Sequence, residues 1–378
     1  MYIPYGHQTI DEEDIQKVSE VLRGDFITTG PVVEKFEKEV AAYTDAKYAV
    51  AVSNGTAALH IACLAAGIQE GDEVITTPIT FAASANCALY CGATPVFADI
   101  NPKTYNIDPA DIERKITSKT KAIIPVHFAG QPCDMDAIHE IARKHNLLVI
   151  EDAAHALGAE YKGRKIGGLS DMTTFSFHPV KPITTGEGGM VVTNDEGLYE
   201  RLKLFRNHGI TREEKLLQPY DESEGGWYYQ QLKLGFNYRL TDIQAALGCN
   251  QLTKLDGFLE KRAAIAAKYD EFFAENENIE TPQLMEDIKS GWHLYPIQVP
   301  GERRKEIFTR LREAGIGVQV HYIPVYKHPY YQENGYKEVC CPNAEALYQG
   351  LISLPIYPGL TEEQQEYVIK KLLEIVGI

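Results

Sequence analysis

The sequence lacks the features that mark a membrane protein, a secreted protein or a nucleic-acid-binding protein. Its 378 residues contain no apolar run of the ~18 residues needed to cross a bilayer. The first residues, MYIPYGHQTIDEEDI, have neither the basic nor the apolar region of a signal peptide. Basic side chains are in deficit, because 37 Lys and Arg stand against 53 Asp and Glu, a formal charge of −16. We therefore expect binding to neither nucleic acid nor membrane, although a local basic pocket could still exist.

Cysteines are also few. The seven are an odd number for a disulfide framework, and most lie in apolar stretches such as Ile61–Leu64. This pattern is typical of buried, reduced thiols in a cytoplasmic protein. Cys340 and Cys341 are adjacent and have no matching second pair nearby, so we expect no zinc or other metal site.

Short β-rich runs alternate with helical patterns from about residue 48 onward. Helical spacing of apolar residues appears at 56–66 and 135–145. Because most of the β-rich runs are continuously apolar, they are expected to be buried on both faces of a mostly parallel sheet covered by helices. The predicted strands are 48–53, 73–76, 94–98, 122–126, 147–152, 173–177 and 190–193.

The pattern changes after about residue 195. Residues 211–226 are polar and carry no strand signal, so they are interpreted as a loop, and 242–273 predicts one long helix or a pair. We predict an α/β protein with a large domain over 1–250 and a smaller C-terminal α+β domain over 251–378. The smaller domain is expected to contain β-type runs at 292–299 and 318–321 and helices near 303–314 and 362–376.

Three segments of the large domain carry the candidate chemistry, and the first is SNGTAA at 53–58. It lies between a predicted strand and a predicted helix. Free N–H groups at a helix start, together with the hydroxyls of Ser53 and Thr56, can bind an anion such as a phosphate. A plain helix cap and turn is an equally good interpretation.

The second segment is LLVIEDAAH at 147–155, where a buried strand ends on Asp152. Ligands of open α/β sheets bind beyond the carboxyl ends of the strands. A carboxylate there needs a cationic or hydrogen-bonding partner, and a protonated heterocyclic nitrogen would serve. The alternative for Asp152 is a helix cap, and for His155 it is a structural hydrogen bond.

The third segment contains Lys181, which follows a predicted strand and precedes the glycine-rich residues 186–189. A lone lysine is usually a solvated surface residue, but apolar and small residues flank this one. Desolvation lowers the pKa of a lysine and makes its amine a nucleophile toward carbonyls. Lys181, Asp152 and the possible phosphate site together predict a pyridoxal phosphate site, with 181 − 152 = 29 residues between lysine and carboxylate.

At this point the chain resembles the DegT/StrS-type sugar-nucleotide aminotransferases, a family within the fold-type I pyridoxal phosphate enzymes. The resemblance covers residues 10–373. Within this family, HLYPI (293–297), VQVHYIPVY (318–326) and ISLPIYPGLT (352–361) resemble the subgroup that acts on a UDP-linked 4-keto sugar in pseudaminic acid biosynthesis. The family motifs are SNGTAAL (53–59), TTPITFAASANC (76–87), EDAAHALG (151–158), SFHPVKPITTGEGG (176–189), RNHG (206–209) and GFNYRLTDIQAALG (235–248).

The resemblance implies a role for each cofactor-binding residue. Lys181 would hold pyridoxal 5′-phosphate as a Schiff base and move the proton between cofactor and substrate. Asp152 would pair with the pyridinium nitrogen, His155 would hydrogen-bond near the phenolic oxygen, and Phe81 would stack on the ring or simply pack in the core. The phosphate would be held by three residues on the same chain, Thr56, Ala57 and Ser176.

Asn237 would reach the phosphate of the neighbouring subunit, which implies a homodimer with shared active sites. The nucleotide sugar requires local positive charge in this acidic protein, and each basic candidate could instead be a solvated surface residue. Tyr5 and Tyr322 could contact sugar hydroxyls or simply pack. The basic candidates are Lys162, Arg164, Lys165, Arg206, Arg239 and His321.

The resemblance implies a transamination in two half-reactions. L-Glutamate would donate an amino group to the cofactor, which would pass it to C4 of a UDP-linked 4-keto-6-deoxy-N-acetylhexosamine. Three alternatives remain: another nucleotide-linked 3- or 4-keto sugar, a different pyridoxal phosphate reaction such as a desulfurase, and a non-enzymatic sugar-binding or regulatory role. An intact Lys181 and Asp152 argue against the last. The product's destination in flagellin, spore coat or another surface polysaccharide stays open.

Overall fold

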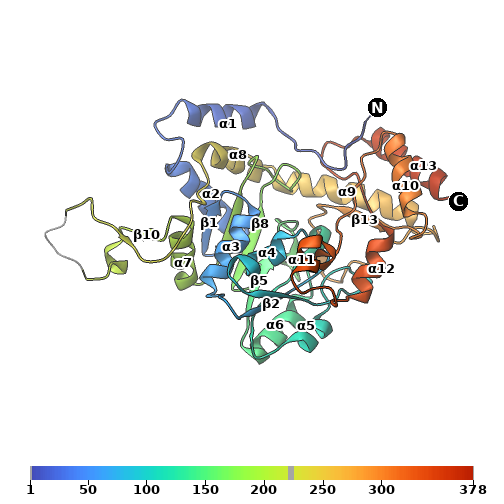
Figure 1. Ribbon diagram of the computed structural model, residues 1–378. Helices are drawn as coiled ribbons and strands as arrows, with labels where there is room; N and C mark the ends of the chain where they lie inside the picture. The colour runs from blue at the N-terminus through green and yellow to red at the C-terminus, as the bar shows by residue number, and fades with distance from the viewer. Residues whose placement is uncertain (1, 220–224, 378) are drawn as a thin grey trace.

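A seven-stranded sheet forms the centre of the computed structural model, which describes residues 2–219 and 225–377 (Figure 1). The strand order is β1-β9-β8-β5-β4-β2-β3. All seven predicted runs become strands of this one sheet, with ends that differ by two residues at most. The strands are β1 (Tyr48–Val52), β2 (Glu73–Thr76), β3 (Thr94–Phe97), β4 (Thr120–Ile124), β5 (Leu148–Asp152), β8 (Met172–Ser176) and β9 (Gly189–Thr193).

The sheet is mostly parallel, as predicted. β3, β2, β4, β5 and β8 run parallel to one another, and β9 is antiparallel to both β8 and β1. β1 therefore runs in the same direction as β8. The carboxyl ends of β1, β2, β5 and β8 consequently meet at one edge, where ligands of such sheets bind.

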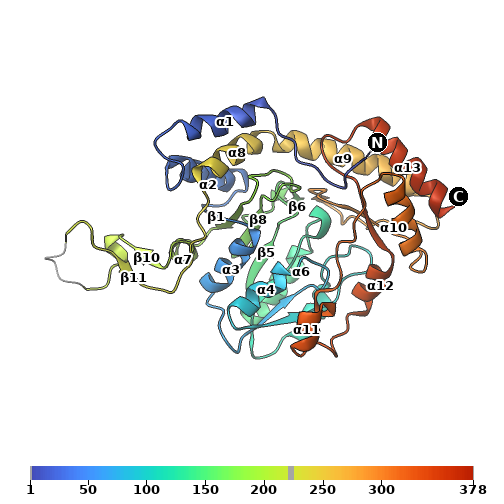
Figure 2. The same cartoon turned by 45° about the horizontal axis from the view of Figure 1, so that its top comes forward.

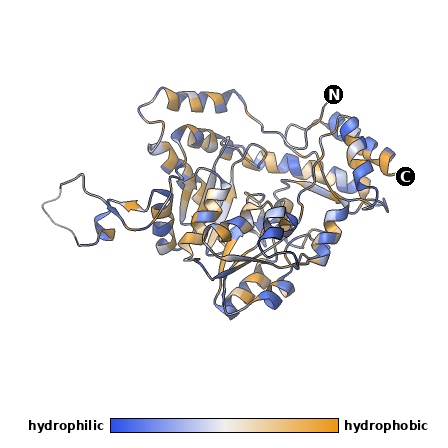
Figure 3. Ribbon diagram, viewed as in Figure 1, coloured by the Kyte–Doolittle hydropathy of each residue, from blue (hydrophilic) through white to orange (hydrophobic). Residues whose placement is uncertain are grey.

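Helices cover both faces of the sheet (Figure 2). α3 (Gly55–Ala65), α4 (Ala83–Tyr90) and α7 (Glu196–Arg206) pack on the face that receives Val50 and Val52 of β1. The opposite face, which receives Ala49 and Ala51, is covered by α2 (Pro31–Tyr43), α6 (Met135–His145) and α8 (Asp242–Thr253). The outer helices show blue and orange turns in alternation, as expected of helices with one buried side (Figure 3). α1 (Glu12–Leu22) packs against α8, and α5 (Pro109–Lys115) lies beside α6.

The C-terminal part has its own apolar core. α9 (Leu255–Phe273) follows α8 directly, so the predicted helical stretch 242–273 is a pair of helices. β13 (Tyr295–Gln298) pairs with β14 (Leu351–Leu354), and α10 (Arg304–Glu313) and α13 (Glu362–Val376) pack around them together with Ile3. The expected run at 318–321 is not a strand, because only Gln319 forms an isolated bridge, to Ser353. The domain boundary near residue 250 stays a prediction.

A narrow arm projects from the body of the molecule (Figure 1). Its base is a two-stranded ribbon of β10 (Ile210–Thr211) and β11 (Gln230–Gln231), and η2 (Glu214–Leu216) follows β10. The interpretation of 211–226 as a loop is therefore wrong at both Thr211 and 214–216, while residues 220–224 lie outside the described part. The remaining elements are β6 (Glu160–Tyr161), β7 (Arg164–Lys165), β12 (Ile288–Lys289), η1 (Phe128–Gly130), η3 (Val325–Lys327), α11 (Pro329–Glu333) and α12 (Pro342–Gly350).

The described part of the chain lacks two features, a membrane-spanning helix and a metal-binding cluster. Within 2–219 and 225–377, each helix is too short or too polar to cross a membrane. The same residues contain no group of three or more His, Cys, Asp or Glu side chains placed to hold a metal ion. All seven cysteines are free thiols.

Candidate active site

Lys181 lies in the turn after β8 and is partly buried. Its backbone N–H donates to His178 O over 2.9 Å, and its Nζ lies 3.3 Å from Nε2 of His293. Burial lowers the pKa of the amine to about 8, although the negative charge of Asp152 acts in the opposite direction. About a tenth of the Lys181 amine is thus uncharged at pH 7 and about half at pH 8, as a nucleophilic amine requires.

Asp152 ends β5 and is 5% exposed. Its Oδ2 accepts a hydrogen bond of 2.6 Å from the Ser84 hydroxyl, which lies 2.7 Å from the Thr80 hydroxyl. Its Oδ1 accepts from the N–H of Ala154 over 3.1 Å. The chain continues through turns into β6, so among the described residues Asp152 caps no helix. The carboxylate is held in place by neutral donors, while its charge reaches Lys181.

Two buried histidines lie beside the lysine. The rings of His155 and His293 are 4.4 Å apart, and Nε2 of His155 lies 3.2 Å from the Tyr322 hydroxyl. Burial, reinforced by the charge of Lys181, holds the pKa of both imidazoles well below the ordinary value. Both rings are therefore neutral, and within the described residues Nδ1 of each has no hydrogen-bond partner. Such orphaned polar atoms are expected where a ligand completes the site.

The amino end of α3 lies next to the end of β8. A Cβ at Gly55 would come within 2.9 Å of Ser176 Cβ, so glycine is required for this close approach. Asn54 is the N-cap and its Oδ1 accepts from the N–H of Ala57 over 2.8 Å. The cap and turn proposed as one interpretation of 53–58 are therefore present. The N–H groups of Gly55 and Thr56 precede the intrahelical ladder and can still bind an anion.

Aromatic side chains surround the opening of this site. Phe81 is 64% exposed and its ring lies 6.4 Å from that of Tyr322. The ring of Tyr5 lies 5.3 Å from His321, whose Nδ1 is 3.0 Å from the Ser353 hydroxyl. Burial and the charge of Lys181 lower the pKa of His321 to about 4. The structure thus brings Phe81, Tyr322, His321 and Tyr5 together beside Lys181, at the meeting of the N-terminal segment with the C-terminal part.

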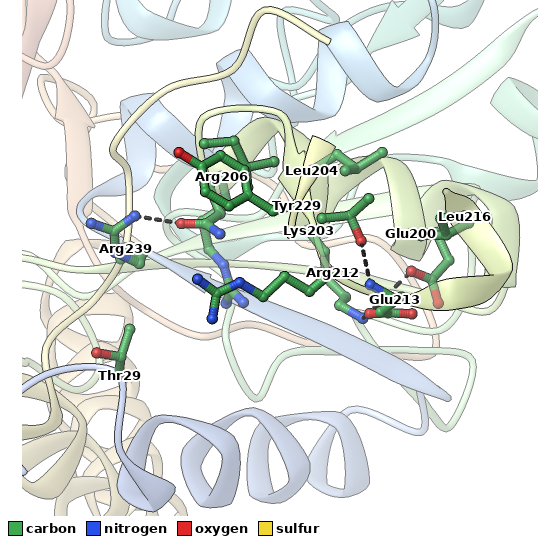
Figure 4. Close-up of a pocket in the computed structure, with 13 residues that line it drawn as sticks. Thr29, Glu200, Lys203, Leu204, Arg206, Arg212, Glu213, Leu216, Tyr229 and Arg239 are labelled. Carbon is green, nitrogen blue, oxygen red and sulfur yellow. Dashed lines mark hydrogen bonds and ion pairs between the residues drawn. The ribbon is translucent and has the colours of Figure 1, made fainter. Parts of the chain in front are cut away.

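Asn237 and Arg239 flank Tyr238 at the carboxyl end of β1, where Arg239 bridges Val52 and Ser53 donates to Tyr238 O over 2.8 Å. Asn237 forms a backbone bridge with Asn207, and Arg239 donates to the Asn207 side chain. Figure 4 shows Arg239 in a separate hollow between α7 and the arm, together with Arg206 and Arg212. Arg206 already forms an ion pair with Glu37. No hydrogen bond or ring contact within the described residues connects Asn237 or Arg239 with Lys181.

The other basic candidates lie on the hairpin of β6 and β7. Lys162 forms an ion pair with Asp136 over 2.6 Å, and Lys165 pairs with Glu160 over 3.1 Å. Arg164 donates to Gly168 O over 3.4 Å. The contacts of all three residues are with this local part of the surface, and their role in sugar binding stays a prediction.

Two residues of the site were not among the predicted ones. Ser84 holds Asp152, and His293 contacts Lys181. Both lie in motifs quoted from the sequence, TTPITFAASANC and HLYPI, but Ser84 lies beyond the loop after the strand 73–76, and His293 lies at the start of the predicted run 292–299. Their proximity depends on the folding of distant segments, so the only available signal was their position in those motifs.

The residues present fit pyridoxal 5′-phosphate. A nucleophilic amine at Lys181, a buried carboxylate at Asp152 and a helix amino terminus beside Ser176 provide one partner for each of its aldehyde, ring nitrogen and phosphate groups. The orphaned Nδ1 of His155 adds a further polar atom. The fold and the site together define a fold-type I pyridoxal phosphate enzyme.

Comparison with known proteins identifies the family. The chain belongs to the DegT/DnrJ/EryC1/StrS aminotransferase family, whose model matches residues 8–373. It is 45% identical to the spore coat polysaccharide biosynthesis protein SpsC of Bacillus subtilis, with 99% of this chain and 97% of the relative covered. It is 41% identical to a UDP-4-amino-4,6-dideoxy-N-acetyl-β-L-altrosamine transaminase of Campylobacter jejuni, with the same coverage.

Solved structures agree with this assignment. Helicobacter pylori PseC, an aminotransferase of pseudaminic acid biosynthesis, has a TM-score of 0.91 and 36% identity, covering 100% of this chain and 99% of that one. A putative sugar aminotransferase of Streptococcus pneumoniae, solved in a PLP-form, has a TM-score of 0.92 and 32% identity, with the same coverage. The predicted fold class, enzyme class and cofactor are thereby confirmed.

Proposed function

We propose that this aminotransferase carries an amino group from L-glutamate to C4 of a UDP-linked 4-keto-6-deoxy-N-acetylhexosamine. The product would be UDP-4-amino-4,6-dideoxy-N-acetyl-β-L-altrosamine, for pseudaminic acid biosynthesis in the cytoplasm. The observation that carries the proposal is the partly buried Lys181 amine with its lowered pKa. The amine lies close enough to Asp152 for the carboxylate charge to act on that pKa. The choice of sugar is supported by the relatives from Campylobacter jejuni and Helicobacter pylori. The free thiols agree with a reducing compartment.

When bound, pyridoxal phosphate supplies an electron sink for the pair released from the substrate carbon. Asp152, held by Ser84, would keep the proton on the ring nitrogen and so maintain that sink. Lys181 would take the proton from the substrate carbon and deliver it to the cofactor carbon that receives the amino group, because about half of its amine is uncharged near pH 8. The amino end of α3 and Ser176 would hold the phosphate and thereby fix the orientation of the ring.

A second candidate sugar has its own support. The relative SpsC is named for spore coat polysaccharide biosynthesis, and its identity to this chain is slightly higher than that of the transaminase from Campylobacter jejuni. A different nucleotide-linked 3- or 4-keto sugar therefore stays the alternative substrate. The contacts of Tyr5, His321 and Tyr322 would determine the choice in either case.

We also propose that the active enzyme is a homodimer in which Asn237 and Arg239 complete the site of the neighbouring subunit. The lack of a contact between either residue and Lys181 within the described part of the chain supports this arrangement. Large apolar side chains that are exposed on the monomer give it further support, because exposed apolar surface can mark a protein–protein contact. These side chains are Ile15, Leu22, Phe26 and Ile27 near α1 and Leu234 at the base of the arm.

The absorption spectrum of the purified protein, before and after addition of L-glutamate, tests the proposed function. We expect a yellow protein whose visible band bleaches with glutamate and returns when the UDP-linked 4-keto sugar is added. Lys181→Ala should fold, retain little colour and transfer no amino group, because the nucleophile is removed. Transfer by Lys181→Ala at the wild-type rate would contradict the assignment of the lysine.

Two further outcomes separate the alternatives. Return of the colour with a TDP-linked keto sugar but not with the UDP-linked one would replace the proposed substrate by the alternative. A protein that stays colourless after incubation with pyridoxal phosphate would contradict the enzymatic role and favour a sugar-binding one.

A further inference from the structure

Among the described residues, the imidazole of His293 has one hydrogen-bonding neighbour, Lys181. Its Nε2 lies 3.3 Å from Nζ of Lys181, and no described group pairs with its buried Nδ1. His293 itself is 4% exposed, so water offers little compensation. A neutral imidazole carries its hydrogen on one nitrogen only, and the hydrogen bonds decide which one.

The direction of this hydrogen bond follows from the unpaired nitrogen. Orphaned N–H donors are rare in protein interiors, and unsatisfied acceptors are tolerated somewhat better. We therefore assign the hydrogen of His293 to Nε2, which leaves the Nδ1 lone pair unpaired. In that tautomer Nε2–H donates to the lone pair of the Lys181 amine, and that lone pair exists only when the amine is uncharged.

The charges around Lys181 agree with this direction. The titratable groups that interact electrostatically with Lys181 are Asp152 from β5, His155 from the turn after β5, His178 from the turn after β8, and His293 and His321 from the C-terminal part. Burial lowers the pKa of all four histidines. Asp152 is thus the only charged group of this set, and no described carboxylate forms an ion pair with Lys181.

His293 is itself held by a buried arginine. Arg262 of α9 is 1% exposed, and its Nη1 donates to the carbonyl oxygens of Trp292 at 3.1 Å, His293 at 3.4 Å and Ile356 at 2.9 Å. No carboxylate in the described part of the chain pairs with this guanidinium. Burial of a charged guanidinium costs free energy, even where backbone carbonyls bind it. The contacts of Arg262 with residues 292 and 293 therefore require a reason beyond packing.

The opposite side of the same segment is also fixed. Gly291 donates its N–H to Gly130 O over 2.8 Å, and Leu294 donates to Ala129 O over 3.3 Å. A Cβ at Gly130 would lie 2.6 Å from the backbone nitrogen of Trp292, so the two segments touch directly. The backbone that carries His293 is therefore clamped between the turn at 128–130 and Arg262.

We propose that His293 is a further catalytic residue, which holds the free-base amine of Lys181 by donating from Nε2, and that Arg262 is the positioning residue that keeps His293 there. This inference rests on the proposed function of Lys181 as the reacting amine. The imidazole would hold the amine in place whenever it is released from the cofactor, ready to take the proton from the substrate carbon.

The test measures the reactivity of the Lys181 amine in the full chain freed of cofactor. Trace acetylation with acetic anhydride between pH 6 and 10, followed by mass spectrometry of the peptide that contains Lys181, gives its titration midpoint. His293→Phe keeps the site dry but removes the donor. Loss of one hydrogen bond to the neutral amine is expected to raise the midpoint and slow acetylation at pH 7 about fivefold.

His293→Gln is the matched variant, because its amide N–H can replace Nε2–H. It should restore most of the wild-type acetylation rate. An unchanged midpoint in His293→Phe would overturn the proposal, and so would a lower one, since that would mean that the imidazole accepts from the ammonium group. If His293→Phe does not fold, His293→Leu replaces it, because leucine also lacks the donor. A wild-type midpoint in folded His293→Leu would overturn the proposal in the same way.

Arg262→Lys tests the positioning role, and Arg303→Lys is its control. Arg303 also binds backbone carbonyls, those of Val376 at 2.7 Å and Ile375 at 2.8 Å, but these belong to the end of α13. We expect Arg262→Lys to raise the Lys181 midpoint. In the His293→Phe background, the same substitution should cause no further rise. Arg303→Lys should leave the midpoint unchanged. Equal midpoints in Arg262→Lys and the wild type would reduce Arg262 to a structural role.

These results are independent of the spectral test. Acetylation reports on the Lys181 amine whether or not the protein transfers amino groups. A colourless, inactive protein with the expected midpoints would contradict the proposed function alone. A yellow, active protein with unchanged midpoints would contradict the role of His293 alone.

Discussion

Burial of an amine without an ion-paired carboxylate destabilises the folded chain. At Lys181 the same burial keeps the amine reactive, so the destabilisation accompanies the catalytic role. The pKa of the amine is lowered from the ordinary 10.5 to about 8 by desolvation, so the folded state disfavours the ammonium form. A residue that must act as a nucleophile and a base near neutral pH is thereby kept reactive. The same shift connects the activity of the site with the stability of the protein.

Lys181→Met should stabilise the cofactor-free protein at neutral pH. Because the unfolded state binds the proton more tightly than the folded state, the wild type carries the full penalty below about pH 8 and loses it as the pH rises toward 10.5. The advantage of the variant should approach about 3 kcal/mol at pH 7 and shrink above pH 8. Urea unfolding at pH 7 and at pH 9.5 measures it. An advantage that is the same at both pH values would mean that the lysine is not desolvated.

The two principal site residues were predictable for a physical reason. Asp152 and Lys181 both lie at or just after a buried strand, and strand ends of a parallel sheet converge on one edge. Ser84 and His293 could not be placed in the same way. Ser84 reaches Asp152 across 68 residues, and His293 reaches Lys181 across 112, so no local pattern connects either pair.

Among the secondary-structure elements, α2 depends on a residue far away in the sequence. Its own N-cap is Gly30, which offers no side chain. Asp242, at the start of α8, accepts from the N–H groups of Gly30 at 2.7 Å, Val32 at 2.8 Å and Val33 at 3.3 Å. A fully buried carboxylate therefore caps α2 from 210 residues away and joins it to α8.

Asp242→Ala should cost about 2–3 kcal/mol in the free energy of unfolding, because three buried N–H groups lose a charged acceptor. Asp195→Ala provides the comparison. Asp195 caps only its own helix, α7, through one bond of 2.7 Å to the N–H of Leu198, and its loss should cost about 1 kcal/mol. Urea unfolding of both variants measures the difference. Equal losses would show that Asp242 acts as an ordinary local cap.

Elements could be predicted where their residues carry the pattern themselves. The seven strands of the central sheet are buried on both faces, so their apolar runs are visible in the sequence. β10 and β11 have two residues each and polar side chains in β11, and no periodicity distinguishes them from a loop. The run at 318–321 looks like a strand, but only Gln319 pairs with β14, through a single bridge to Ser353.

In the monomer, the predicted site residues do not all contact one another. Lys181, Asp152 and His155 lie together, while Asn237 and Arg239 interact with Asn207, and Arg239 also bridges Val52 at the end of β1. A single sequence does not show whether a residue acts in its own subunit or in the neighbouring one. The sequence motif is the same in either case. The exposed apolar side chains near α1 also raise the question of whether two subunits associate. A mixing experiment tests directly whether they share their sites.

Mixing two inactive variants should restore activity if the sites are shared. Lys181→Ala removes the amine, and Asn237→Asp places a negative charge where a phosphate is expected, so each homodimer should be inactive. At equal amounts, half of the dimers are mixed, and in each of these one site combines an intact Lys181 with an intact Asn237 from the other subunit. Activity should therefore recover to about a quarter of the wild-type value after joint refolding. Mixing Lys181→Ala with Asp152→Ala is the control, since both residues belong to one subunit and no intact site can form. No recovery in the first mixture, with mixed dimers verified by mass spectrometry, would place Asn237 in the site of its own chain and contradict the shared-site dimer.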